Sequence, residues 1–227
     1  MSEALAPSAA FARRSTNRLT RHDLGRFDGD TLFSALGRAV CDAGCLPRKE
    51  FFEAWEMARR VRRRFRGGRI VDLAGGHGLL AQALLLLDDS SPAAVVVDAS
   101  LPPSAPRLHE SIATAWPRLR DRVTVGQSDL ESVALDGHDV VVSCHACGRL
   151  TDQVLALAVR ARARVAVLPC CHDERDAPPM LEAWMDPALA LDVDRAQRLA
   201  RAEYDVWTQT IPSDITPKNR LLMARPA

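Results

Sequence analysis

The chain has 227 residues, of which 47% are hydrophobic, and a formal net charge of +1 at pH 7. This length and composition can bury one full core, so we expect one domain with a small N-terminal extension. The near-zero net charge argues against electrostatic binding of nucleic acid by the protein surface as a whole. No apolar run is long enough to predict a membrane span. We expect a cytoplasmic protein whose six cysteines are thiols, since the sequence shows no pattern of a secretion signal.

The first 67 residues predict two parts that precede the main domain. Residues 1–26 mix Ala, Ser, Pro and Arg without periodicity, which predicts a flexible arm whose end docks on the domain. Residues 27–67 predict a helical cap, because apolar residues recur at helical spacing and a second helix is expected from Pro47 to Arg66. Six arginines lie between Arg59 and Arg66. A solvated helix end is the simpler interpretation of these arginines, and an RNA-binding patch is the alternative.

The stretch RIVDLAGGHG, from Arg69 to Gly78, predicts a strand and a tight turn, and an apolar helix from Leu79 to Leu87 follows. A glycine-rich turn lets a ligand approach the backbone and the free amides of the helix N-terminus. The dinucleotide pattern G-x-G-x-x-G fits poorly, because the glycines stand at 75, 76 and 78. The turn resembles the acidic-x-G-x-G-x-G pattern of class I S-adenosylmethionine (SAM) methyltransferases. Asp72, Gly76 and Gly78 match that pattern, and Ala74 replaces its first glycine.

The next two strands carry polar residues at their ends. An apolar run from Ala93 to Val97 predicts a strand buried on both faces, and it ends in Asp98, where a carboxylate can accept hydrogen bonds from ribose hydroxyls. A helix is expected over 105–119. A third strand over 122–125 then leads to Ser128 and Asp129. The resemblance implies that Asp129, or else Ser128, faces the adenine amino group, although either residue could cap a short helix instead.

Strands four and five, predicted over 138–142 and 165–168, each end in a segment that contains cysteines and a histidine. Neighbouring parallel strands present such ends at one edge of a sheet, where α/β proteins bind ligands. We therefore expect six side chains to converge there: Cys144, His145, Cys147, Cys170, Cys171 and His172.

Three chemical interpretations compete for these side chains, beside simple packing. We favour substrate handling, with His145 or His172 removing a proton from the acceptor. The second interpretation is a zinc site built from Cys144 and Cys147 together with Cys170 and Cys171, or with the histidines. It ranks lower because adjacent side chains of an extended segment, such as Cys170 and Cys171, point to opposite faces. The third is covalent catalysis by Cys170. We expect chemistry among His145, Cys170 and His172, and no metal.

The combined motifs resemble one branch of the class I methyltransferases over Leu46 to Pro226. They are His-x-Cys-Gly-x-Leu-Thr-Asp, starting at His145, and Pro-Cys-Cys-His, starting at Pro169. This branch includes poorly characterised bacterial proteins and the methyltransferase domain of glutathione-S-transferase-C-terminal-like proteins. The resemblance implies a Rossmann-like α/β fold, with a seven-stranded, mostly parallel sheet and an antiparallel C-terminal hairpin, over 68–227. It also implies SAM as cofactor, bound by Asp72, Ala74, Gly76, Gly78, Asp98, Ser128, Asp129 and Ser143.

The C-terminal part agrees with this frame. A helical region is expected from Met180 to about Glu203, interrupted by Pro187, with Trp184 among its packing residues. Two strands then form the closing hairpin, over 206–211 and 221–224. The loop between them is either a wall of the substrate site or an ordinary polar turn.

The acceptor of the methyl group is left open by the sequence, and RNA, protein and metabolite all remain candidates. Two alternatives to a methyltransferase also remain. The chain could be a non-catalytic SAM-binding or nucleotide-binding module that docks on a partner through its Arg-rich helix. It could also be an NAD-dependent oxidoreductase, although the glycine spacing disfavours this. The sequence does not predict an oligomeric state.

Overall fold

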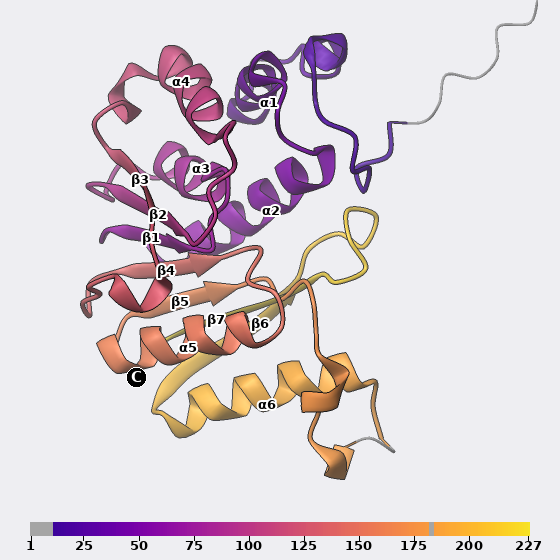
Figure 1. Ribbon diagram of the computed structural model, residues 1–227, viewed down its shortest axis with the longest axis vertical. Coiled ribbons are helices and arrows are strands. Elements are labelled where there is room, and N and C mark those ends of the chain that lie inside the picture. Colours follow the sequence, from indigo (N-terminus) through magenta and orange to yellow (C-terminus); the bar gives the residue numbers. More distant parts are fainter. Residues whose placement is uncertain (1–10, 182–183) are drawn as a thin grey trace, which may run out of the picture.

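The computed structural model describes residues 11–181 and 184–227, and its centre is one seven-stranded sheet (Figure 1). The strand order is β3-β2-β1-β4-β5-β7-β6. Strands β1 to β5 are parallel, whereas β7 runs antiparallel to β5 and β6 antiparallel to β7. This confirms the predicted fold class. The strands are β1 Ile70–Leu73, β2 Ala94–Asp98, β3 Val123–Gln127, β4 Val140–Ser143, β5 Arg164–Val167, β6 Tyr204–Thr210 and β7 Arg220–Pro226.

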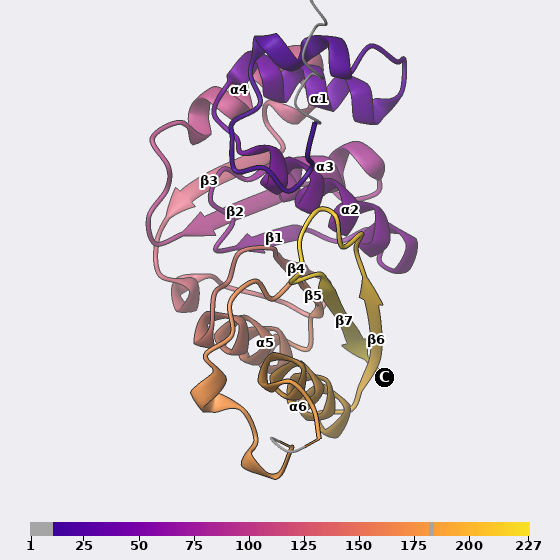
Figure 2. The same ribbon diagram turned by 90° about the vertical axis from the view of Figure 1, so that its right-hand side faces the viewer.

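In the described part of the chain, six α-helices cover both faces of the sheet (Figures 1 and 2). Helices α1 to α4 pack with Ile70, Val96 and Val140 on one face, and α5 and α6 pack with Val71 and Val141 on the other. Successive residues of a strand point to opposite faces, so a strand covered on both sides is mostly apolar. The helices are α1 Leu32–Ala43, α2 Arg48–Arg64, α3 Leu79–Leu87, α4 Ala105–Ala115, α5 Arg149–Ala161 and α6 Pro187–Arg201. No helix within the described ranges is long and apolar enough to cross a membrane.

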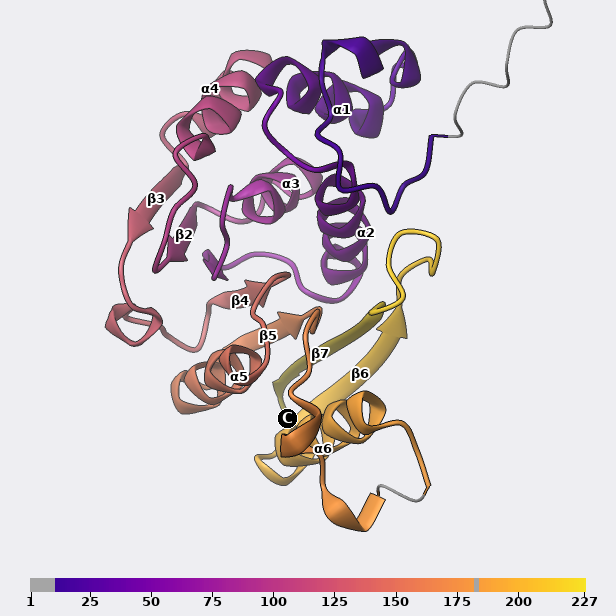
Figure 3. The same cartoon turned by 45° about the vertical axis from the view of Figure 1, so that its right-hand side comes forward.

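The strand order reverses at β1, which lies between β2 and β4. After β1 the chain builds one side of the sheet with β2 and β3, and it then returns to build the other side from β4. The two connections leave in opposite directions and open a crevice at the carboxyl ends of β1 and β4. The loop 211–219 between β6 and β7 lies at this same edge, because β7 is antiparallel to β5 (Figure 3).

The N-terminal cap is held by an aromatic cluster between α1 and α2. The ring centroid of Phe51 lies 5.4 Å from that of Phe27 and 5.3 Å from that of Phe33. Residues 11–26 pack on this cluster: Phe11 contacts Phe27, and Leu19 is fully buried. The predicted flexible arm falls partly outside the described residues, because the description begins at residue 11.

Two predicted helices differ from the observed ones, and proline explains both differences. The helix expected over 105–119 ends at Ala115, and Pro117 opens a short 3-10 turn. Pro187 does not interrupt a helix but begins α6, where the side chain of Asp186 accepts a hydrogen bond from the amide of Leu189 at 3.0 Å. Proline lacks an N–H and has a fixed φ, so it suits the first turn of a helix and not the interior. The prediction that Trp184 packs in a helix is wrong, since its side chain is 85% exposed.

Candidate active site

A cavity of about 330 Å³ lies at the crevice where the strand order reverses. Its walls come from the turn after β1, the end of β2, the segment after β4 and one face of α2. The polar and turn residues that line it are Glu50, Asp72, Ala74, Gly75, Gly76, His77, Asp98, Cys144 and His145.

In the turn after β1, glycines without side chains line the cavity. A Cβ atom added at Gly75 would lie 2.7 Å from the side chain of Val96, so only glycine fits there. Gly76 has a φ of +51°, and a Cβ atom added to it would meet nothing within 4 Å. Ala74, which replaces the first glycine of the pattern, also has a positive φ, of 55°. The turn therefore leaves open space beside the backbone of Gly76.

Asp72 lies beneath this turn and is 1% exposed. Its Oδ2 accepts a hydrogen bond from the amide of Ala81 at 3.3 Å, while its Oδ1 is buried without a partner among the described residues. Burial raises the pKa of this carboxyl to about 7. An unpartnered carboxyl oxygen at the wall of a cavity is costly unless a ligand there satisfies it.

Asp98 joins the end of β2 to the glycine turn. Its Oδ2 accepts a hydrogen bond from the amide of Gly76 at 3.0 Å, and its Oδ1 accepts one from the amide of Ser100 at 2.9 Å. The carboxylate thus lies at the mouth of the first loop.

The other predicted cofactor residues lie at different distances from this cavity. Gly78 is the N-cap residue of α3 behind the turn. Ser143 ends β4 next to the lining residue Cys144, and its buried Oγ has no partner among the described residues. Ser128 and Asp129 are exposed and are not among the residues that line the cavity.

Helix α2 contributes a carboxylate that our sequence analysis missed. Glu50 lines the cavity, and burial together with nearby Glu53 raises its pKa. Glu53 forms an ion pair with Lys49 at 3.0 Å, and its second oxygen is buried without a partner in the described structure. The available signal was an acidic residue within the apolar face formed by Phe51, Ala54 and Trp55.

The two predicted catalytic histidines have different environments. His145 lines the cavity, and burial lowers its pKa to about 4, assisted by Lys49 and His77. Its imidazole is therefore neutral at pH 7. His172 does not line this cavity. Its Nε2 lies 2.8 Å from Oδ1 of Asp192 on α6, and its side chain is 3% exposed. Cys170 lies with Cys147 and Cys171 at the ends of β4 and β5.

The acidic side chains that line the cavity have no basic side chain among them in the described structure. Asp72, Asp98 and Glu50 supply three carboxyl groups, while none of the described lining residues is Lys or Arg. Such a site suits a ligand with positive charge and opposes a polyphosphate.

The arginines at the end of α2 are largely engaged within the protein. Arg62 is 3% exposed, donates to the carbonyl of Leu84 at 3.0 Å and pairs with Asp88. Arg59 and Arg60 both pair with Glu56. Three of the six arginines therefore have acidic partners within the protein, and no nucleic acid is needed to explain them.

The fold is Rossmann-like, and a comparison with known families identifies the class of protein. A family described as a methyltransferase domain matches residues 50–177, more than half of the chain. The chain belongs to this family. No curated protein matches it.

Solved structures share the fold at low sequence identity. The pyocyanin biosynthetic protein PhzM is 21% identical, with a TM-score of 0.52, over 91% of this chain and 61% of that chain. The ribosomal protein L11 methylase of Lactobacillus delbrueckii subsp. bulgaricus is 13% identical, with a TM-score of 0.52, over 79% of each chain. The B. subtilis M1A22 tRNA methyltransferase TrmK is 17% identical, with a TM-score of 0.51, over 75% of this chain and 65% of that chain. The chain matches about three fifths of the length of several such structures.

Proposed function

We propose that this protein transfers a methyl group from SAM to an acceptor. The observation that carries the proposal is the cavity beside the open turn at Gly76, whose lining holds three carboxyl groups and neither Lys nor Arg among the described residues. SAM has a cationic sulfonium and an ammonium group, which match this charge. NAD instead carries two phosphates, which such a lining repels.

The proposed roles follow from where each residue lies. Asp98 would accept hydrogen bonds from the ribose hydroxyls, and Gly76 would admit the ligand beside bare backbone. The unpartnered oxygen of Asp72 would accept a hydrogen bond from the ammonium group. The unpartnered hydroxyl of Ser143 is a further candidate contact. An adenine contact by Asp129 or Ser128 stays a prediction.

When bound, SAM supplies a methyl group that an acceptor can attack in line with the carbon–sulfur bond. The side chains of this protein then have two tasks, to position the acceptor and to receive its proton. We assign His145 to the second task, because it lines the cavity and is neutral at pH 7. We assign a positioning role to His172, which is held by Asp192. Cys170 as a nucleophile remains a prediction, and so do the specific branch of the family and the acceptor class, RNA included.

Isothermal titration with SAM and, in parallel, with NAD tests the cofactor. We expect saturable one-to-one binding of SAM and no binding of NAD at the same concentrations. Labelled SAM with fractionated cell extract then identifies the acceptor class by the fraction that takes up label. Binding of NAD in preference to SAM would refute the proposal.

Asp72 predicts a specific dependence of stability on pH. Burial raises its pKa from 3.8 to about 7 in the ligand-free fold. Between these values the folded state binds a proton that the unfolded state has lost, so the free energy of unfolding falls as the pH rises. The full effect is on the order of 4 kcal/mol. Asp72→Asn should remove this slope in urea unfolding measured from about pH 5 to about pH 8.

The same group should make SAM affinity depend on pH. A cation beside Asp72 favours the ionised carboxylate, so affinity should rise with pH up to about 7 in the parent protein and stay flat in Asp72→Asn. Asp121→Asn, at an exposed carboxylate, is the matched control. An Asp72→Asn variant with an unchanged pH slope would show that Asp72 is not the titrating group.

A further inference from the structure

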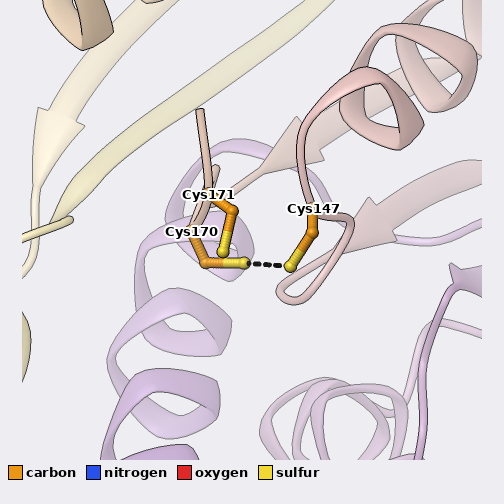
Figure 4. Close-up of side chains that lie close together, drawn as sticks. All are labelled: Cys147, Cys170 and Cys171. Carbon is orange, nitrogen blue, oxygen red and sulfur yellow. Dashed lines mark hydrogen bonds between the residues drawn. The ribbon is translucent and has the colours of Figure 1, made fainter. Parts of the chain in front are cut away.

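Three cysteines from two loops bring their sulfur atoms together at the carboxyl edge of the sheet (Figure 4). The Sγ atoms of Cys147, Cys170 and Cys171 lie within 4.8 Å of one another, and those of Cys147 and Cys170 are 3.0 Å apart. A tetrahedral zinc ion with Zn–S bonds of about 2.3 Å holds its sulfurs about 3.8 Å apart, which is longer than the Cys147–Cys170 separation and within the upper bound for the group. We propose that Cys147, Cys170 and Cys171 bind one Zn²⁺ ion.

The structure removes the reason for which the sequence ranked a metal site low. Adjacent residues point to opposite faces only in a regular strand, and β5 ends at Val167, before the two cysteines. In the irregular segment that follows, the side chains of Cys170 and Cys171 both turn toward Cys147 (Figure 4). The two neighbouring cysteines can therefore act as ligands of one ion.

Backbone contacts hold the two loops in this arrangement. The amide of Gly148 donates to the carbonyl of Cys171 at 2.8 Å, which joins the loop after β4 to the loop after β5. Gly148 has φ 57° and ψ −127°, a conformation that only glycine adopts readily. The hydroxyl of Thr151 donates to the carbonyl of Ala146 at 2.6 Å. The thiols thus start from positions that the fold sets before a metal arrives.

The surroundings favour zinc over harder cations. Thiolates are soft ligands, which select Zn²⁺ over Mg²⁺ or Ca²⁺. Three thiolates and one Zn²⁺ leave a net charge of −1. Lys218 acts electrostatically on Cys171 and offsets this remaining negative charge.

The site differs from a closed structural zinc site. The grouping contains three protein ligands among the described residues, and Cys147 and Cys171 are exposed. Catalytic zinc sites have three protein ligands and an open fourth position, whereas structural sites have four. The fourth position here would be open to water or to a ligand from solvent, beside the segment whose Cys144 and His145 line the cavity.

Cobalt titration of the reduced full-length protein tests the site without reference to methyl transfer. We expect one Co²⁺ per chain, with the sulfur-to-metal charge-transfer absorption of thiolate ligands and displacement by Zn²⁺. Cys147→Ser, Cys170→Ser and Cys171→Ser should each weaken binding more than about 100-fold. Cys41→Ala and Cys45→Ala are the controls and should leave binding unchanged, since both are buried thiols outside this group of three. Circular dichroism checks that each variant is folded.

Two results would overturn the proposal. One is the absence of stoichiometric Co²⁺ and Zn²⁺ binding by the reduced, folded parent protein. The other is unchanged binding in the three serine variants. Peptide mapping under mild oxidation separates a redox pair from a metal site: we expect Zn²⁺ to protect Cys147 and Cys170 from forming a disulfide. A disulfide that forms equally with and without Zn²⁺ would count against the metal.

Discussion

Replacing Gly76 with Asp should weaken SAM binding by more than about 100-fold, or about 2.7 kcal/mol, without unfolding the protein. Gly76 has a φ of +51° with open space at the Cβ position, and Asp tolerates this backbone region better than most residues. The new side chain would instead fill the space that the ligand needs beside the backbone. It would also bring a second carboxylate close to Asp98, which accepts a hydrogen bond from the amide of Gly76.

The measurement is calorimetric titration with SAM, together with thermal unfolding of the ligand-free proteins. Gly25→Asp is the matched control, because Gly25 is exposed and also has open space at its Cβ position. The control should keep the parent affinity. Undiminished SAM binding by Gly76→Asp would show that the cofactor lies elsewhere.

The fold could be predicted largely from local patterns. Strands β1, β2, β4 and β5 are short, largely buried runs rich in Val and Ile, and apart from Asp72 their polar residues stand at the strand ends. The glycine turn directly follows β1, and the acidic residue Asp98 is the last residue of β2. Because parallel strands end at one edge, these local features were enough to place Asp72, Gly76 and Asp98 near one another.

The parts that depend on long-range partners could not be predicted. Glu50 faces the cavity because of how α2 packs on α3, and helical periodicity alone does not give that orientation. His172 turns toward Asp192, which is 20 residues further along the chain. The end of α4 and the start of α6 were misplaced. A proline can either stop a helix, as Pro117 does, or begin one, as Pro187 does, and the local pattern does not distinguish the two.

The orientation of Cys170 and Cys171 also depends on a long-range partner and could not be predicted from the sequence. The rule of alternating faces applies within β5 and no longer applies at Cys170 and Cys171, three and four residues after its end. What orients the cysteines is the hydrogen bond between Gly148 and Cys171, which joins segments that are separated in the sequence by the whole of α5.

Arg195 on α6 connects the loop after β4 to Asp192 on its own helix, and its loss should lower the stability of the fold. Its guanidinium is 1% exposed, lies 2.8 Å from Asp152 and 3.1 Å from Asp192, and donates to the carbonyl of Gly148 at 3.1 Å. Arg195→Ala would leave partly buried carboxylates and a carbonyl without this partner. Such a change costs about 3 to 5 kcal/mol for a buried pair, and we expect the lower value, because Arg198 still pairs with Asp152.

Urea unfolding at neutral pH measures this loss, and Arg198→Ala provides the comparison. Arg198 pairs with the same Asp152 but is 48% exposed, so its removal should cost less than about 1 kcal/mol. Arg195→Ala should also loosen the loops after β4 and β5, because Arg195 holds Gly148 and Asp192 in place. Hydrogen exchange should then accelerate at the amide of Gly148, which donates to Cys171, before global unfolding. Equal losses of stability in the two variants would mean that burial of Arg195 does not set its contribution.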